Sequence, residues 1–138
     1  MRIKPLHLSH SASSSDGGIA TAVSQLLTAQ QRDSMVARWI TADQYHPFNR
    51  DHHLIDTIQA LDIELIHAHG LWRSATRVLK SSRLSNLPTI ISPHGMLDEW
   101  AMAYSPWKKW IVWQLWESYA MNEASCIHAL CEAEAQAI

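Results

Sequence analysis

The sequence PTIISPHGMLD, residues 88–98, decides the fold class, because an apolar β-type run passes through a His-Gly pair into a helical pattern. Gly95 in this position permits a sharp turn or the close approach of another group. The same order of strand, glycine-containing loop and helix occurs after residues 3–9 and after residues 63–68. The sequence therefore predicts repeated strand–loop–helix units.

The spacing of apolar residues places these units along the whole chain. We predict strands at residues 3–9, 34–40, 63–68, 88–92 and 125–130, and helices at residues 19–31, 51–61, 71–84 and 105–124. Strands that alternate with helices are typical of a parallel sheet. The expected fold class is α/β, a Rossmann-like parallel sheet with helices on both faces.

Composition narrows the class of protein. The chain has 138 residues, of which 47% are hydrophobic, so we expect one domain over residues 1–138 with a real core. A net charge of −2 argues against a nucleic-acid partner. The first apolar segment is too short and too interrupted by polar residues for a signal peptide, and no apolar run approaches about 20 residues, so we expect a cytoplasmic location. Cys126 and Cys131 lack metal-type spacing, and we expect a reduced pair with at least one member buried.

The glycines predict where a binding site lies. The chain has four, Gly17, Gly18, Gly70 and Gly95, and each follows a predicted strand and precedes a helix. Loops of this kind emerge together at the carboxyl edge of a parallel sheet, where ligands bind. We therefore expect the three loops to converge, although tight turn geometry alone also explains a glycine in such a loop.

The first loop offers backbone groups to an anion. Gly17 and Gly18 come before a helix whose first N–H groups are unpaired, and two glycines let a phosphate reach them. Asp16 is either the N-cap of this helix or a substrate-binding residue. The motif is neither GxGxxG nor a P-loop, so the signal rests on position alone.

The other two loops carry histidines. His94 can donate a hydrogen bond to a phosphate or a sugar hydroxyl, and His69 is expected to face the cleft. We expect His67 and His69 to point to opposite sides of the sheet, because side chains alternate along a strand. His-x-His is also similar to the metal pair of barrel hydrolases, which is the main rival interpretation. The third interpretation is that these histidines are structural residues within the core.

Four blocks of the chain resemble a known family. The blocks IHAHGLW (66–72), PTIISPHGMLDEWAM (88–102), KKWIVWQLWE (108–117) and ASCIHALCEAEAQAI (124–138) look like the amino-terminal domain of family 4 glycosyltransferases, retaining enzymes with the two-domain GT-B fold. DGGIATAVSQL (16–26) agrees with the first turn and helix of that domain. Residues 35–64 are too loosely similar to contribute.

The resemblance implies a reaction and its partners. A hexosyl group would pass from a nucleotide-sugar donor to a glycan or lipid-linked glycan acceptor, in polysaccharide or lipopolysaccharide synthesis, with retention at the anomeric carbon. The amino-terminal domain would supply the acceptor side of the cleft, and a carboxyl-terminal domain would hold the nucleotide. No metal or other cofactor is expected. Peripheral contact with the inner face of a membrane is compatible with a lipid-linked acceptor.

The resemblance also implies site residues. His94 matches a catalytic cleft histidine near the donor sugar, and the expected substrate-binding residues are Asp16, Gly17, Gly18, His69, Gly70, Gly95 and Glu132. Cys131 departs from the family, which commonly has serine in this SEAE-like turn, and cysteine is a weaker N-cap. We expect the carboxyl-terminal nucleotide domain to be absent, and therefore an incomplete GT-B fold that is inactive as an isolated fragment.

Two other functions remain open at this point. One is a noncatalytic remnant that binds glycan or protein, and the other is a metal-dependent hydrolase that uses His67 and His69. The hydrolase would need further carboxylate and histidine ligands at later strand ends. Four tryptophans at intervals of three, residues 107, 110, 113 and 116, favour packing in a core, with membrane contact as the alternative.

Overall fold

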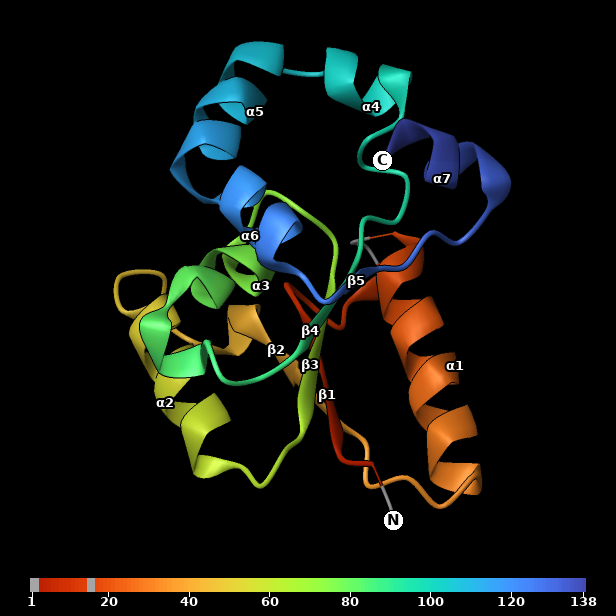
Figure 1. The fold of residues 1–138 in the computed structure, drawn as a ribbon, viewed down its shortest axis with the longest axis vertical. Helices are drawn as coiled ribbons and strands as arrows, with labels where there is room; N and C mark the ends of the chain where they lie inside the picture. The colour runs from red at the N-terminus through yellow and green to blue at the C-terminus, as the bar shows by residue number, and fades with distance from the viewer. Residues whose placement is uncertain (1–2, 15–16) are drawn as a thin grey trace.

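The computed structural model describes residues 3–14 and 17–138 and contains one five-stranded sheet (Figure 1). All neighbouring strands are parallel, and the order across the sheet is β2-β1-β3-β4-β5. The strands are β1 (Pro5–Ser9), β2 (Arg38–Thr41), β3 (Leu65–His69), β4 (Thr89–Ser92) and β5 (Cys126–Ile127). The predicted Rossmann-like α/β class is confirmed.

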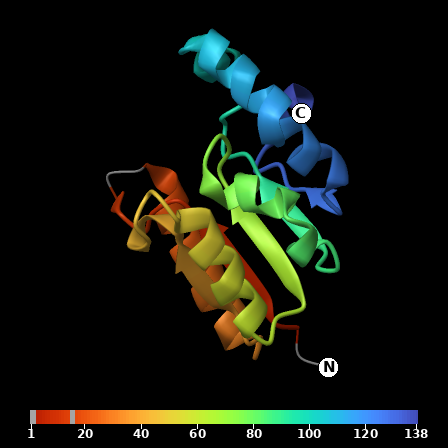
Figure 2. The ribbon, with the colours of Figure 1, turned by 90° about the vertical axis from the view of Figure 1, so that its left-hand side faces the viewer.

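Helices cover both faces of this sheet. Figure 1 shows α1 (Gly18–Arg32) on one side, and α2 (Arg50–Ala60) and α3 (Ser74–Arg77) on the other. The remaining α-helices are α4 (Glu99–Ala103), α5 (Pro106–Val112), α6 (Ser118–Glu123) and α7 (Glu132–Ala137). Short 3₁₀ turns are η2 (Ala42–Gln44), η3 (Val78–Lys80) and η4 (Ser82–Leu84), and η5 (Trp113–Glu117) is a π-helical segment. Helices α4 and α5 extend beyond the carboxyl edge of the sheet (Figure 2).

The two faces of the sheet differ in chemistry. Along β1 and β3 the residues that point towards α2 and α3 are apolar, and they form a fully buried core with those helices (Leu6, Leu8, Ile66, Leu54, Ile58 and Val78 among others). The alternate residues, which face α1, include three buried histidines, His7, His67 and His69. Because side chains of a strand alternate between faces, one sequence pattern builds an apolar layer and an imidazole layer.

Several predicted elements differ in length from the observed ones. The predicted strand at 34–40 begins only at Arg38, because Ser34 adopts a left-handed backbone and Met35 N–H still bonds to Gln30 at the end of α1. The predicted strand at 125–130 is only two residues long. The predicted helix at 71–84 is broken at Ser81, whose backbone is extended and whose hydroxyl caps η4.

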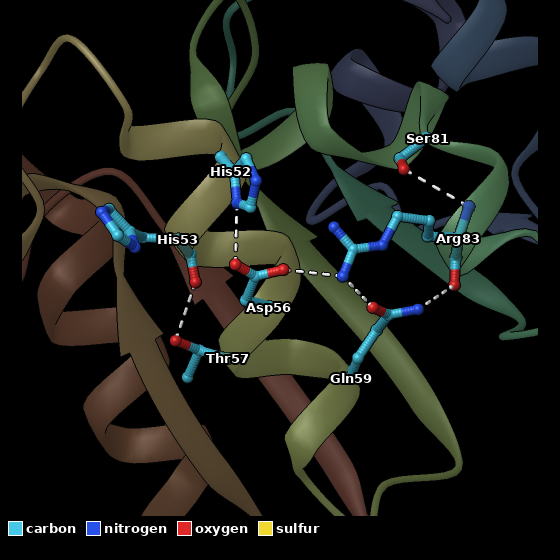
Figure 3. A network of polar contacts seen from close by, with 7 residues as sticks. All are labelled: His52, His53, Asp56, Thr57, Gln59, Ser81 and Arg83. Atoms are coloured by element: carbon cyan, nitrogen blue, oxygen red, sulfur yellow. Dashed lines mark hydrogen bonds and ion pairs between the residues drawn. The ribbon is translucent and has the colours of Figure 1, made fainter.

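A polar network fastens η4 to α2 (Figure 3). Asp56 accepts from Arg83 at 2.6 Å and from His52 at 2.7 Å, and Gln59 exchanges two hydrogen bonds with Arg83. These side chains are largely exposed, so each ion pair adds little on its own. The network fixes the short turns that replace the predicted helix and lies on the outer side of α2.

One expectation about the cysteines is wrong. Both cysteines are free, but both are exposed, so neither is buried. Trp107 and Trp110 expose 64% and 65% of their surface, so any core packing of these two tryptophans would have to involve elements outside this chain. Among the helices of residues 3–14 and 17–138, none combines the length and the apolar character that crossing a membrane requires.

Candidate functional site

The loops that follow β1 and β3 enclose a small cavity of about 90 Å³. The strand order reverses between these two strands, which is where open α/β sheets bind ligands. The cavity is lined by His10, Ser11, Ile19, His69, Gly70, Leu71, Arg73, Ala75 and Met96. His69 and Gly70, both singled out from the sequence, therefore lie beside the start of α1 and the loop after β4.

Gly70 lets these loops approach one another closely. Its backbone has a φ of +80°, and a Cβ here would lie 3.0 Å from Ile19 Cδ1 and 3.3 Å from Met96 Cε. A side chain would therefore be strained in its backbone and would press on the side chains of Ile19, in α1, and Met96, in the loop after β4. The positive φ is what favours glycine here, and the missing Cβ lets the neighbouring side chains pack closely.

His67 and His69 lie on the same face of the sheet, so the prediction of opposite faces is wrong. Residues two apart along a strand share a face, because the side-chain period is two. The two rings stack with centroids 4.1 Å apart, and both residues are buried. His69 reaches the cavity, whereas His67 bonds to Ser92.

A chain of hydrogen bonds runs from α1 to the loop after β4. Gln30 Oε1 lies 2.7 Å from His7 Nε2, His7 Nδ1 lies 3.0 Å from His69 Nε2, and His69 Nδ1 lies 3.0 Å from His94 Nε2. A second, shorter series joins His67, Ser92 and His128, with contacts of 2.8 and 2.9 Å. Five of the nine histidines in the chain thus belong to one connected group of rings.

Burial keeps the inner rings of this group neutral. Burial, followed by the smaller effect of the neighbouring imidazoles, lowers the pKa of His69 to about 2 and that of His67 to about 3. Burial also lowers the pKa of His7, against its hydrogen bond to Gln30. The pKa of His94 is lowered as well, although the negative charge of Glu134 opposes the effect of burial. All four rings are therefore neutral near pH 7.

The turn that carries His94 is held by a buried carboxylate. His94 and Gly95 both have left-handed backbones, with φ of 56° and 75°. Gly95 N–H donates to Glu134 Oε1 at 2.6 Å, and Leu130 N–H donates to Glu134 Oε2 at 2.7 Å. Glu134 thereby ties the loop after β4 to the start of α7 and fixes the position of the His94 ring.

The remaining predicted site residues lie away from this group. Gly17 and Gly18 are exposed at the start of α1, and a Cβ at either would meet no atom within 4 Å. Glu132 is exposed on α7 and accepts only from Gln136, at 3.4 Å. Asp16 lies outside the described residues.

A metal ion would have three donors here. Within the described part of the chain, His7, His67 and His69 are the group whose ligand atoms lie close together, within 4.8 Å of one another. No carboxylate joins this group, and two of its nitrogens already contact each other at hydrogen-bond distance. The donor set therefore lacks the carboxylates that the hydrolase interpretation requires.

The model of the protein family described as "Glycosyl transferase 4-like domain" matches residues 44–138. The chain belongs to this glycosyltransferase family. The match includes β3, β4, β5 and the loops that carry His69, Gly70, His94 and Gly95. It begins within residues 35–64, which the sequence resemblance left out.

The other two comparisons add nothing to this assignment. No curated protein matches the sequence. Among solved structures, maleylacetate reductase from Rhizobium sp. strain MTP-10005 is similar at 17% identity, with a TM-score of 0.41. That match covers 67% of this chain, which spans 24% of the reductase chain.

Sequence reasoning missed three members of the site of this glycosyltransferase domain. His7 and Gln30 join it through contacts across 62 and 23 residues, which no local motif reveals. Glu134 was present in the CEAE turn, but its neighbour Glu132 was chosen. Both glutamates lie in the first turn of α7, and only the burial of Glu134, which the sequence does not show, distinguishes them.

Proposed function

We propose that this domain forms the acceptor side of a glycosyltransferase that moves a hexosyl group from a nucleotide sugar to a glycan or a lipid-linked glycan. Family membership supports glycosyl transfer in general. The donor, the acceptor and retention at the anomeric carbon belong to the proposal. So does a nucleotide-binding domain that faces the carboxyl edge of the sheet.

One observation carries the proposal for the site. His69, Gly70, His94 and Gly95 follow two different strands, and hydrogen bonds and the cavity lining bring them together at that edge. The half-buried His94 ring lies beside a turn that Glu134 holds, so it needs no rearrangement to form a hydrogen bond with a substrate. In this proposal His94 is the catalytic residue that contacts the reacting sugar.

Sugar transfer tests this role of His94. We expect His94→Ala, in the chain joined to a nucleotide-binding domain, to lower kcat and kcat/KM by similar factors of about 10². The loss is shared because the contact is stronger in the transition state than in the ground state. The measurement is transfer from a panel of nucleotide sugars, with the anomeric configuration of the product read by NMR.

His52→Ala is the matched control, because the His52 side chain is 70% exposed on the outer side of α2. It should leave transfer unchanged. If His94→Ala retains normal turnover but unfolds at a much lower temperature, His94 is a structural residue and this assignment of the site is wrong.

A further inference from the structure

Hydrogen bonds link the rings of His7, His69 and His94 into a chain, and this chain constrains which ring nitrogens carry protons. A neutral imidazole carries one N–H and one bare nitrogen, so each ring in a chain donates on one side and accepts on the other. His7 and His69 use both ring nitrogens in the chain, and His94 uses only Nε2. Once one end of the chain is fixed, the tautomer of every ring is fixed as well.

Gln30 fixes that end. Its Oε1 atom faces His7 Nε2 at 2.7 Å, and a carbonyl oxygen can only accept, so His7 carries its proton on Nε2. His7 Nδ1 is then bare and accepts from His69 Nε2. By the same step, His69 Nδ1 accepts from His94 Nε2. The chain ends with a bare Nδ1 on His94.

We propose that Gln30 and His7 are positioning residues that hold His94, through His69, in the Nε2–H tautomer. His94 Nδ1 then offers a lone pair at the candidate site. Resting on the proposed function, this lone pair would accept a hydrogen bond from a sugar hydroxyl. The role differs from the sequence-based expectation, in which His94 donates a hydrogen bond to a phosphate or a sugar hydroxyl.

The surroundings of the chain support neutral rings. A protonated imidazole donates from both nitrogens, so a charged ring inside the chain would place two donors against each other. His7 and His69 are 0% and 4% exposed, and burial disfavours charge on both. Glu134 is the carboxylate whose charge favours a cation on His94, and it acts at the outer end of the chain.

Gln30 acts from a distance, which makes the inference testable without touching the site. Gln30 is half-buried on α1, its side chain faces His7, and it is not among the residues that line the cavity. Gln30→Glu keeps an acceptor oxygen towards His7, and Gln30→Leu removes it with little change in volume. Gln31→Leu is the matched control, because Gln31 is exposed on the same helix.

The test is a two-bond ¹H–¹⁵N correlation spectrum of the ¹⁵N-histidine-labelled chain at pH 7, which distinguishes pyrrole-type from pyridine-type ring nitrogens. The His94 signals are assigned by their loss in His94→Gln. We expect His7, His69 and His94 to carry pyrrole-type Nε2 and pyridine-type Nδ1 in the wild type, in Gln30→Glu and in Gln31→Leu. In Gln30→Leu we expect His94 to become a mixture of both tautomers.

Three outcomes would overturn the proposal. A wild-type His94 with its proton on Nδ1 does so before any variant is made. An unchanged His94 pattern in a folded Gln30→Leu, with folding checked by circular dichroism, does so as well. The third is zinc retained at one equivalent after dialysis, with His7 and His69 nitrogens shifted by coordination.

Sugar transfer separates this inference from the proposed function. In the chain joined to a nucleotide-binding domain, Gln30→Leu should lower kcat/KM by about tenfold, the value of one ordinary hydrogen bond, and Gln31→Leu should not. If the spectra give the expected tautomers but no sugar is transferred, the positioning role holds and the proposed function fails. If transfer occurs with His94 in the other tautomer, the reverse is true.

Discussion

A single carboxylate, that of Glu134, holds two backbone N–H groups of the candidate site. One belongs to Gly95 in the loop after β4, and the other to Leu130 before α7. Removing the carboxylate leaves both donors without their partner, and an unpaired buried donor costs more than the bond itself is worth. This contact holds a turn in which His94 adopts a left-handed backbone that a residue with a Cβ disfavours.

We therefore expect Glu134→Ala to lower the free energy of unfolding by about 1–3 kcal/mol. Glu132→Ala, two residues away and exposed, should change it by less than about 0.5 kcal/mol. Urea unfolding of both variants measures the difference. Equal effects of the two substitutions would show that the Glu134 contacts do not hold the turn.

Single residues also show where sequence reasoning stops. The strand-end histidines and Gly70 and Gly95 were predictable, because a glycine or histidine that ends an apolar run is unusual. The sequence does not reveal that His7 pairs with His69, since β1 and β3 are adjacent only through the sheet order. The sequence allowed a correct prediction for His67, because residues two apart in a strand share a face. The prediction was wrong because His67 and His69 were treated as if they were neighbours on alternate faces.

At the scale of elements, the start of α1 places two glycines in different backbone states. Gly17, the N-cap, has a φ of +84°, and Gly18, the first residue of the helix, has no positive φ. A Cβ would meet no atom within 4 Å at either position. Any difference between substitutions here therefore comes from the backbone alone.

Gly18→Ala should raise the free energy of unfolding by about 0.4–1 kcal/mol, because alanine restricts the unfolded chain at no cost to the helix. Gly17→Ala should lower it by about 1–2 kcal/mol, because a left-handed backbone is unfavourable for a residue with a Cβ. Thermal unfolding of the two variants is the measurement. A destabilised Gly18→Ala would mean that residue 18 lies outside the helix.

Element lengths were harder to predict than element types. The sequence predicted one helix at residues 105–124 and none at Glu99–Ala103, where α4 lies; the left-handed backbone of Ser105 separates α4 from α5. The π-helical segment η5 then carries buried Glu117, which accepts from Trp72 N–H and the Thr76 hydroxyl. A π-helical segment has i→i+5 hydrogen bonds, and the spacing of apolar residues in a sequence does not indicate where such a segment interrupts an α-helix.

For the whole molecule, the parallel sheet was predictable because strands and helices alternate along the chain. The polar character of one face was not predicted, although the order Leu6, His7, Leu8 in one strand indicates an apolar face and a face that carries histidine. An apolar layer loses little when the pH changes, whereas a layer of neutral imidazoles is sensitive to acid. The fold therefore has one face that responds to pH and one that does not.

That difference predicts unfolding in mild acid. The pKa values of His7, His67, His69 and His94 are lowered by burial from 6.5, so below pH 6.5 the unfolded chain binds protons that the folded chain does not. Stability then falls as pH falls, by about 1.4 kcal/mol per pH unit for each ring, and for His67 the loss continues to about pH 3.

Glu117 opposes this loss but does not reverse it. Burial raises the pKa of Glu117 above 4.5, so the folded state binds this proton before the unfolded state does as the pH falls. One proton bound in this way favours the folded state, whereas up to four protons on the histidines favour the unfolded state.

Against a total stability of about 5–15 kcal/mol, we expect the urea concentration at the unfolding midpoint to fall steeply between about pH 6 and pH 4.5. His67→Gln should reduce the loss of stability per pH unit by the contribution of one ring. A midpoint that stays constant over this range would mean that the buried rings take up protons in the folded state, and the neutral hydrogen-bonded chain would then be wrong.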